Sequence, residues 1–329
     1  MKGACGNSFR VSANRICFIL LLVLPCASPA SAQYAKDDHH LGPTGKGWSQ
    51  ERGYAPLTFL KGAGINWHGG SIMPGTVHIY YIWYGNWQNG PKPSDSLSTV
   101  NLLNDLFAAT GGISGSGYAQ INTTYGDGLS NVTGNMVLAG STKRKYPRGT
   151  QLTDASILKL VRNALKRGKL PIDANGVYFV LTSSDVSQIS DDAQVGFCSD
   201  YCGWHSRTTI LGTDIKYAFV GNPDRCPFAC EAQTISPNNN SGADGMASVM
   251  AHEAEEALTD PDLDAWFDFF GDENADKCAW KFGPTTGTIG KGAYNQTFGS
   301  HHWLIQMNWE NSRGSGGCVQ TLGGPFYTK

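Results

Sequence analysis

The sequence is short of the two features that would hold it to a membrane or to a polyanion. Its longest unbroken apolar run, residues 16–24, has nine residues, whereas about 20 are needed to span a bilayer. Lys and Arg together number 25 against 27 Asp and Glu, and the basic residues nowhere form a tract. We therefore expect no membrane anchor and no nucleic-acid partner.

The chain also has few charged residues and lacks two common catalytic motifs. Only 16% of its residues are charged, while 41 are Gly and 11% are aromatic; disordered chains usually show high charge and few aromatics. The glycine loop at residues 111–117 has no Lys-Ser or Lys-Thr behind it, which argues against a phosphate cradle, and a GxSxG nucleophile motif is missing. These absences favour an ordered, loop-rich domain without nucleotide or serine-hydrolase chemistry.

The N-terminus has the layout of a secretory signal peptide. Three basic residues and no acidic residue precede the apolar run: Lys2, Arg10 and Arg15. Pro25 ends the run, and residues 30–32 (Ala-Ser-Ala) give the small-x-small pattern that signal peptidase cleaves. We predict that residues 1–32 are removed and that the secreted form begins at Gln33.

Two further features agree with export. Three of the nine cysteines fall in the predicted signal peptide, which leaves six: Cys198, Cys202, Cys226, Cys230, Cys278 and Cys318. An even set in an oxidising compartment predicts three disulfides, whose pairing the sequence does not determine. The alternative is a four-thiolate zinc site built from the first four cysteines, although such sites belong mostly to reducing compartments. Four sequons are candidate glycan sites: Asn122, Asn131, Asn239 and Asn295.

The remaining sequence predicts one domain preceded by an extended segment. Residues 33–65 are rich in Gly, Pro and polar side chains, and residues 66–329 show no repeat or linker that would divide them. Apolar runs predict buried strands at residues 77–84, 176–182 and 217–220. Apolar positions at helical spacing predict helices at residues 95–109, 153–166 and 246–258. Because strands and helices alternate, we expect a single α/β or α+β layered domain.

Five segments in the middle of the chain occur in an order that points to a known family. They are VHIYYIWYGNW (77–87), QLTDASILKLVRNAL through LPIDANGVYFVLTSSDV (151–186), GFCSDYCGWHS (196–206), KYAFVGNPDRCPFAC (216–230) and GADGM (242–246). In this order the chain resembles the Exordium family, also called phosphate-induced proteins. The resemblance implies a secreted protein of the plant apoplast or cell wall that is connected with growth and cell expansion.

The segment after GADGM departs from that resemblance. It continues as MASVMAHEAEEALTD, and its HEAEE is similar to the HExxH helix of zincin metallopeptidases. His252 and Glu256 are four residues apart, so on a helix they project from one face and can hold the same metal ion. Glu253 stands where HExxH enzymes place the general base. The similarity implies a zincin-like metallopeptidase architecture with Zn²⁺ as cofactor.

A catalytic zinc needs a third protein ligand, and many carboxylates follow the motif. We expect the ligand among Asp260, Glu273 and Asp276, with His301 and His302 as further candidates. The residues that flank HEAEE are mostly apolar, so its charges form a narrow stripe, and buried charges need a partner or a metal. The alternative is a solvated helix with an ordinary His–Glu pair.

Calcium is the alternative cofactor. Asp260, Asp262 and Asp264 resemble the opening of an EF-hand loop, but Ala265 and Gly271 replace the Gly and Glu that the loop requires. An EF-hand is therefore excluded. An irregular, all-oxygen Ca²⁺ site that uses some of these Asp residues stays open.

Two function hypotheses of different classes follow. The first is a secreted zinc-dependent metallohydrolase, a peptidase that acts on an extracellular peptide with Glu253 as base. The second is a non-catalytic growth-signalling or wall-associated protein whose metal site is structural or absent. Such a protein could stack aromatic residues on cell-wall sugars, although these residues more often form a core: Trp67, His68, Trp83, Tyr84 and Trp87. Metal content is the measurement that best separates the hypotheses.

Overall fold

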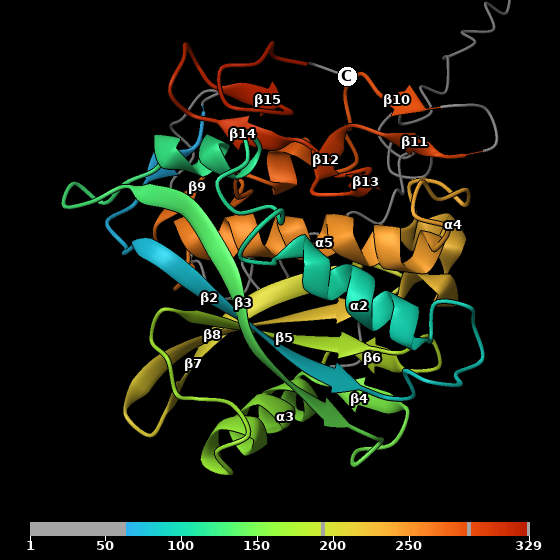
Figure 1. The fold of residues 1–329 in the computed structure, drawn as a ribbon. Helices are drawn as coiled ribbons and strands as arrows, with labels where there is room; N and C mark the ends of the chain where they lie inside the picture. Colours follow the sequence, from blue (N-terminus) through green and yellow to red (C-terminus); the bar gives the residue numbers. More distant parts are fainter. Residues whose placement is uncertain (1–63, 192–194, 288–290, 328–329) are drawn as a thin grey trace, which may run out of the picture. The chain divides into compact units, whose positions relative to one another are not determined.

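The computed structural model describes residues 64–191, 195–287 and 291–327. The predicted signal peptide and the expected N-terminal segment, apart from residues 64 and 65, lie outside these ranges. A five-stranded sheet forms the centre of the described domain (Figure 1). In spatial order its strands are β3 (Val132–Arg144), β2 (Gly75–Tyr84), β5 (Gly176–Thr182), β8 (Thr213–Gly221) and β7 (Gly203–Ile210). The first four strands are parallel, and β7 is antiparallel to β8.

The strands predicted from apolar runs form the middle of this sheet. β2, β5 and β8 contain the three expected runs, and every residue of β5 is buried. Parallel strands covered on both faces need such runs, because neither face meets water. The sequence does not predict the edge strands: the second half of β3 has no buried residue, and β7 alternates between partly and fully exposed positions at residues 206–209.

Helices cover both faces of the sheet. Helix α3 (Asp154–Lys166) lies on one face, and α2 (Leu97–Leu106) and α5 (Ser241–Thr259) lie on the other (Figure 1). The Thr153 side chain caps α3 by accepting a hydrogen bond from the backbone N–H of Ser156, as the sequence predicts. The predicted apolar face of α3 is buried: Ile157, Leu160, Val161, Ala164 and Leu165. Each large side chain of this face contributes about 1.5–3 kcal/mol through its burial.

α5 begins earlier than the sequence predicts, at Ser241 rather than Met246. Asn240 caps it by accepting a hydrogen bond from the N–H of Ala243, and every residue of the helix except Ser241 and Gly245 is buried. The sheet covers one side of α5, and η1 (Ala119–Thr124) and C-terminal strands cover the other (Figure 1). Those strands are β12 (Gln296–Phe298), β13 (His301–Trp303), β14 (Asn308–Glu310) and β15 (Gly317–Val319). A helix covered on two sides places its polar side chains where water cannot solvate them.

Three disulfides connect short elements around α5. The pairs are Cys198–Cys226, Cys202–Cys230 and Cys278–Cys318. The other described elements are β1 (Asn66–Trp67), β4 (Gln151–Thr153), β6 (Ser187–Ile189), η2 (Pro223–Arg225), α4 (Pro227–Cys230), β9 (Trp266–Phe267), η3 (Asp276–Cys278), β10 (Thr286–Gly287) and β11 (Ala293–Tyr294). All six cysteines are therefore paired as predicted, and the alternative four-thiolate zinc site is wrong because its sulfur atoms are bonded to one another.

The aromatic residues of β2 belong to the core and not to a sugar-binding surface. Trp83 and Tyr84 are fully buried, and Trp87 packs edge-on against Trp83. Trp67 is 45% exposed, and the ring of His68 stacks on the ring of Phe267. In the part of the chain that the structure describes, we find no helix with the length and apolar character to cross a bilayer. The mixed α/β layers confirm the coarse fold class.

Candidate metal centre

Three ionisable residues of α5 lie together in the interior. The side chains of His252, Glu253 and Glu256 have no exposed surface, and their ligand atoms lie within 4.8 Å of one another. The Nε2 atom of His252 is 2.8 Å from Oε1 of Glu256, as expected for residues four apart on a helix. The predicted His–Glu pair therefore forms, and Glu253 shares its site.

His205 of β7 joins these residues, and the sequence analysis does not single it out. Its Nδ1 atom lies 3.4 Å from Oε2 of Glu253 and 3.5 Å from Oε2 of Glu256. β7 can approach α5 because residue 203 is Gly: a Cβ atom there would lie 2.5 Å from Cγ1 of Val249. The sequence signal that could have identified His205 is its position three residues after Cys202, a cysteine that forms a disulfide.

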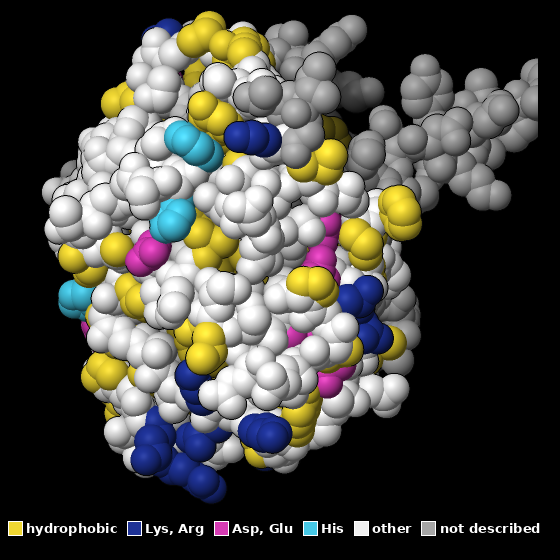
Figure 2. All heavy atoms as spheres, turned by 45° about the vertical axis from the view of Figure 1, so that its right-hand side comes forward, with side chains coloured by type: hydrophobic (Ala, Val, Ile, Leu, Met, Phe, Trp, Pro, Cys, Tyr) yellow, Lys and Arg dark blue, Asp and Glu magenta, His cyan; other side chains and the backbone are white. Residues whose placement is uncertain are grey.

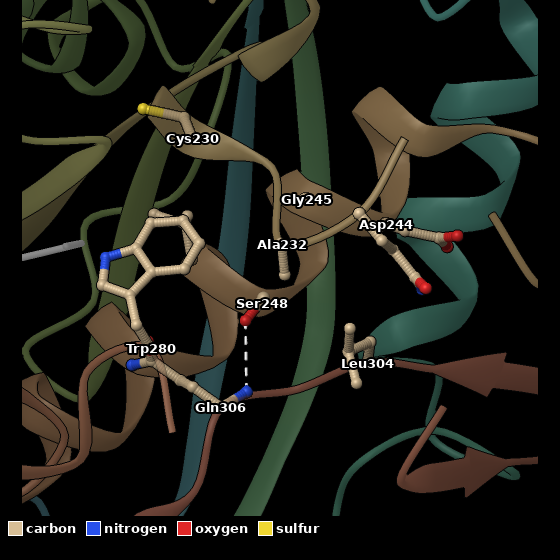
Figure 3. Close-up of a pocket in the computed structure, with 10 residues that line it drawn as sticks. Cys230, Ala232, Asp244, Gly245, Ser248, Trp280, Leu304 and Gln306 are labelled. Carbon is tan, nitrogen blue, oxygen red and sulfur yellow. Dashed lines mark hydrogen bonds between the residues drawn. The ribbon is translucent and has the colours of Figure 1, made fainter. Parts of the chain in front are cut away.

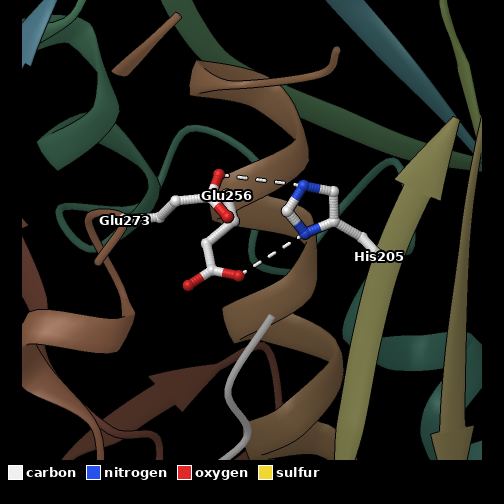
Figure 4. A group of neighbouring side chains, drawn as sticks. All are labelled: His205, Glu256 and Glu273. Atoms are coloured by element: carbon white, nitrogen blue, oxygen red, sulfur yellow. Dashed lines mark ion pairs between the residues drawn. The ribbon is translucent and has the colours of Figure 1, made fainter. Parts of the chain in front are cut away.

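The loop before η3 and the first residue of η3 supply two further carboxylates. Oε1 of Glu273 lies 3.8 Å from Nε2 of His205 (Figure 4), and Oδ1 of Asp276 lies 3.4 Å from Nε2 of His252. The backbone N–H of Asp276 donates to Oε1 of Glu256 across 3.1 Å. The structure thus brings both sequence-predicted residues to the site. We call the six side chains the His–carboxylate cluster: His205, His252, Glu253, Glu256, Glu273 and Asp276.

The other ring nitrogen of His252 is held by a neutral side chain. Its Nδ1 atom contacts the side-chain amide of Gln306, and the backbone N–H of Gln306 donates to Oγ of Ser248 across 3.2 Å. In metal sites the ring nitrogen that does not bind the ion donates its N–H to an acceptor; Gln306 takes that role only with its amide oxygen toward Nδ1, whereas its amide nitrogen Nε2 faces Nδ1 here. The arrangement leaves Nε2 of His252 facing the carboxylates.

Several buried atoms of the His–carboxylate cluster have no hydrogen bond within the part of the chain that the structure describes. Asp276 is the most exposed of its side chains, at 3%. Among the described residues, seven of its atoms have no hydrogen-bond partner: both ring nitrogens of His205, Nε2 of His252, both carboxylate oxygens of Glu253, Oε2 of Glu256 and Oδ1 of Asp276. Burying an unsatisfied charged group costs several kcal/mol. This cost favours a cation among these atoms.

The charges of the cluster shift the pKa values of its members strongly. Burial alone would lower the pKa of both histidines, but the neighbouring carboxylates raise both values well above the usual range. Burial raises the pKa of Glu253 to about 7, although His205 acts against it. Burial also acts to raise the pKa of Glu256, yet the two histidines outweigh it and lower that pKa to about 2. Burial and the charge of Glu256 raise the pKa of Asp276.

The spacing of these atoms fits a small cation. Zn²⁺ binds imidazole nitrogen and carboxylate oxygen at about 2.0–2.2 Å, so two ligand atoms of a tetrahedral site lie about 3.3–3.5 Å apart. The 3.4 and 3.5 Å distances from Nδ1 of His205 to Glu253 and Glu256 have this length. So does the 3.4 Å distance from His252 to Asp276, whereas the 2.8 Å between Nε2 of His252 and Oε1 of Glu256 is the shorter distance of a direct ion pair. Imidazole and carboxylate are both donors that zinc accepts.

Three of the predicted ligands lie elsewhere. α5 ends at Thr259, and Asp260 has φ −139°, so the expectation that Asp260 continues the helix face is wrong. Its Oδ1 atom instead accepts a hydrogen bond from the N–H of Ala265. His301 pairs with Asp105 on the surface, and the ring of His302 stacks on a tyrosine.

The aspartates considered for calcium do not gather either. Oδ1 of Asp262 lies 3.1 Å from the Lys216 ammonium, so this carboxylate faces a cation of the protein itself. Oδ1 of Asp260 bonds to a backbone amide. Asp264 lies against the backbone of Gly70. Among the described residues, no group of ligand atoms within 4.8 Å includes Asp260, Asp262 or Asp264, so the irregular Ca²⁺ site stays a prediction that these contacts do not favour.

The sequons divide into two pairs. Asn122 is fully buried and its Nδ2 atom donates to the carbonyl of Glu255, so a glycan on this atom is incompatible with the fold. Nδ2 of Asn295 donates to two carbonyl groups, those of Phe282 and Ile305, which argues against a glycan there too. Asn131 and Asn239 are exposed and stay predictions, although Nδ2 of Asn131 also donates to a carbonyl, that of Thr123.

A small cavity lies beside the first half of α5. Its volume is about 20 Å³, roughly the space that one water molecule needs. Ser248, Val249, Trp280, Leu304 and Gln306 are among the residues that line it (Figure 3). The His–carboxylate cluster does not line the cavity. Gln306 lies between the two, because it lines the cavity and contacts His252.

The face in Figure 2 is mostly uncharged, and Lys and Arg gather mainly at its lower end.

Comparison with known proteins places the chain in a family. Protein EXORDIUM-like 5 of Arabidopsis thaliana is 30% identical over 62% of this chain and 59% of its own length. Protein EXORDIUM-like 3 of the same plant is 32% identical over 62% of this chain and 64% of its own length. Protein PHOSPHATE-INDUCED 1 of Nicotiana tabacum is 26% identical over 70% of this chain and 74% of its own length.

The chain spans about three fifths of the length of the two EXORDIUM-like proteins. No solved structure matches it. Residues 65–302 match the family described as the phosphate-induced protein 1 conserved region, and this range contains the whole His–carboxylate cluster. The chain belongs to the phosphate-induced protein 1 family, which includes the Exordium proteins.

Proposed function

We propose that this protein is a secreted, wall-associated metalloprotein whose His–carboxylate cluster binds a divalent cation, with zinc preferred. The observation that carries the proposal is the set of fully buried imidazole and carboxylate atoms that lack hydrogen-bond partners while lying 3.4–3.5 Å apart. A cation would bind these atoms and offset the cost of burying them. The complete burial favours a stabilising ion over one that turns over substrate.

Export is part of the proposal and has its own support. The N-terminal sequence has the charge, apolar run and small-x-small pattern of a signal peptide, and disulfide-rich chains belong to oxidising compartments. N-terminal sequencing of the protein from culture medium should find Gln33 first, in free or cyclised form. A chain that keeps Met1 in a membrane fraction would contradict export.

Elemental analysis tests the metal. Protein purified without chelators should contain at least one equivalent of a divalent ion, most of it Zn²⁺, since tight binding is expected of such sites. His252→Ala should lose most of it, whereas His301→Ala, which changes a histidine outside the cluster, should keep it. Less than about a tenth of an equivalent in the unaltered protein would contradict the proposal.

Zinc-dependent hydrolysis, with an extracellular peptide as substrate, is the second candidate function. Glu253 favours it, because its carboxylate faces the cluster with both oxygens free of hydrogen bonds and its pKa is raised to about 7, a value that suits a general base. A zincin-like mechanism would use Glu253 to activate a metal-bound water. The small cavity that Gln306 lines could hold one water molecule near the cluster.

The two candidates differ in what Glu253→Gln does. A general base can be removed without losing an ion that other residues hold, so this variant should keep an ion at His252, Glu256 and Asp276 and lose most turnover of a general peptide library. Glu255→Gln, one helix position from Glu256, is the matched control and should keep both. Absence of turnover in metal-loaded unaltered protein would leave the stabilising, non-catalytic role.

A further inference from the structure

Glu256 occupies an unusual position between the two histidines. Its two carboxylate oxygens face different imidazoles: Oε1 lies 2.8 Å from Nε2 of His252, and Oε2 lies 3.5 Å from Nδ1 of His205. We infer that the His–carboxylate cluster is a binuclear centre, in which two divalent ions are bridged by Glu256. The inference rests on the proposed metal binding and specifies the number of ions and their ligands.

In the first half of the centre, one histidine and one aspartate lie beside Glu256. Nε2 of His252, Oε1 of Glu256 and Oδ1 of Asp276 converge, with Nε2 3.4 Å from Oδ1. Nδ1 of the same imidazole faces the side-chain amide of Gln306 on the opposite side, so Nε2 is the nitrogen directed at the carboxylates. These three atoms are the protein ligands of the first ion.

The second half repeats this arrangement with different residues. Nδ1 of His205, Oε2 of Glu253 and Oε2 of Glu256 lie together, at 3.4 and 3.5 Å from the ring nitrogen. Nε2 of His205 points to Glu273, 3.8 Å away (Figure 4). At this distance Glu273 is an ion-pair neighbour of the imidazole and not its hydrogen-bond partner. Each histidine thus directs one ring nitrogen at the carboxylates of a proposed ion site and the other at a further polar side chain.

The charge of the cluster matches two ions better than one. It contains four carboxylates and two imidazoles, all buried. With neutral imidazoles, one divalent cation would leave two uncompensated negative charges in the interior, which is strongly unfavourable. Two divalent cations make the sum zero, because four negative charges meet four positive ones. No net charge then remains in the interior.

The donor set also indicates which ions fit. Carboxylate oxygens suit Mn²⁺, and imidazoles suit Zn²⁺ and Fe²⁺. The di-iron and di-manganese centres in helical bundles use four carboxylates and two histidines; here three carboxylates and two histidines are assigned as ligands, and a fourth carboxylate, Glu273, lies beside His205. Two-metal centres hold their ions about 3.5–4 Å apart, a separation that the two oxygens of one carboxylate can bridge. We expect first-row transition ions and not Ca²⁺.

Metal titration of the secreted, full-length protein tests the inference. The protein is stripped with a chelator, dialysed and loaded with Zn²⁺, and bound metal is counted by elemental analysis. Two equivalents are expected for the unaltered protein and for Glu255→Gln, and about one for His205→Ala, which removes a ligand of the second ion only. Glu256→Gln should bind less than one, because both ions share this residue.

Manganese provides a measurement that needs no variant. Two Mn²⁺ ions bridged by a carboxylate are magnetically coupled, so the protein loaded with Mn²⁺ should show a coupled-pair spectrum by electron paramagnetic resonance. One equivalent of Zn²⁺ with an uncoupled Mn²⁺ spectrum would overturn the binuclear centre and leave the proposed metal binding intact. No bound metal would overturn both. Two equivalents retained by folded His205→Ala would also contradict the assignment of ligands.

Discussion

Glu255 and Glu256 are neighbours on α5, and both are fully buried, yet their surroundings differ in kind. Oε2 of Glu255 accepts a hydrogen bond from Asn308, and burial raises the pKa of this carboxyl well above its usual value. The histidines beside Glu256 overcome the same effect of burial and lower its pKa to about 2. One carboxyl is therefore kept neutral and the other ionised, within one turn of one helix.

The difference comes from what packs on each side of α5. On the outer side, amide groups from η1, β14 and the loop before η3 meet the helix at Glu255: Asn122, Asn274 and Asn308. Amides donate hydrogen bonds without adding a positive charge, so the bond from Asn308 lowers the pKa of Glu255 less than burial raises it. On the inner side two imidazoles face the carboxylates. Burial alone does not make a carboxyl group a metal ligand. The neighbouring side chains decide whether the group is ionised.

The largest expected effect is on metal content. Glu256→Gln should reduce bound Zn²⁺ at least tenfold, because it removes the charge that both histidines face. Glu255→Gln should leave the metal content unchanged, because a neutral carboxyl and an amide of the same shape make similar hydrogen bonds. Elemental analysis of both variants after identical purification measures the difference.

The pair is informative only if both variants fold. Circular dichroism and gel filtration of each provide that control, and both should match the unaltered protein when metal is present. If Glu255→Gln lost its metal while folded, the division of α5 into a neutral and an ionised side would be wrong.

A second prediction concerns the neutral side. Asn122→Leu should destabilise the protein by about 2–4 kcal/mol, because it leaves the amides of Asn274 and Asn308 without their shared acceptor. Its metal content should not change. Urea unfolding measures the loss, and Asn131→Gln, at an exposed sequon, should change the free energy of unfolding by less than about 0.5 kcal/mol. Loss of metal in folded Asn122→Leu would show that the two sides are coupled.

The parts of the fold that follow simple periodicity could be predicted from the sequence. β5 is apolar throughout because both of its faces are covered, and α3 has a single apolar face with a Thr153 cap. The first turn of α5 could not be predicted, because Gly242 and Gly245 are poor helix formers. Packing on both sides of the helix and the Asn240 cap outweigh that preference.

The same limit applies to the site. HEAEE predicts His252, Glu253 and Glu256 because their spacing alone places them on one helix. Spacing fails for Asp260, where the helix has ended, and it gives no information on His205, which reaches the site through the packing of β7 against α5. Glu273 and Asp276 could be predicted as a group of acids near Cys278, but which histidine each one meets depends on the loop conformation.

The smallest expected effect is a difference in pH dependence between the two carboxyls in metal-free protein. The raised pKa of Glu255 favours its neutral form in the fold, so its contribution to stability is complete below pH 4.5 and declines as pH rises above that value. The lowered pKa of Glu256 has the opposite sign: its contribution is present above pH 4.5 and is lost as pH falls toward 2. With chelator present, Glu255→Gln should therefore remove a decline of at most about 1.4 kcal/mol per pH unit above pH 4.5, as measured by urea unfolding at successive pH values. If its stability curve ran parallel to that of the unaltered protein over this range, Glu255 would be ionised in the fold, and the contrast with Glu256 would fail.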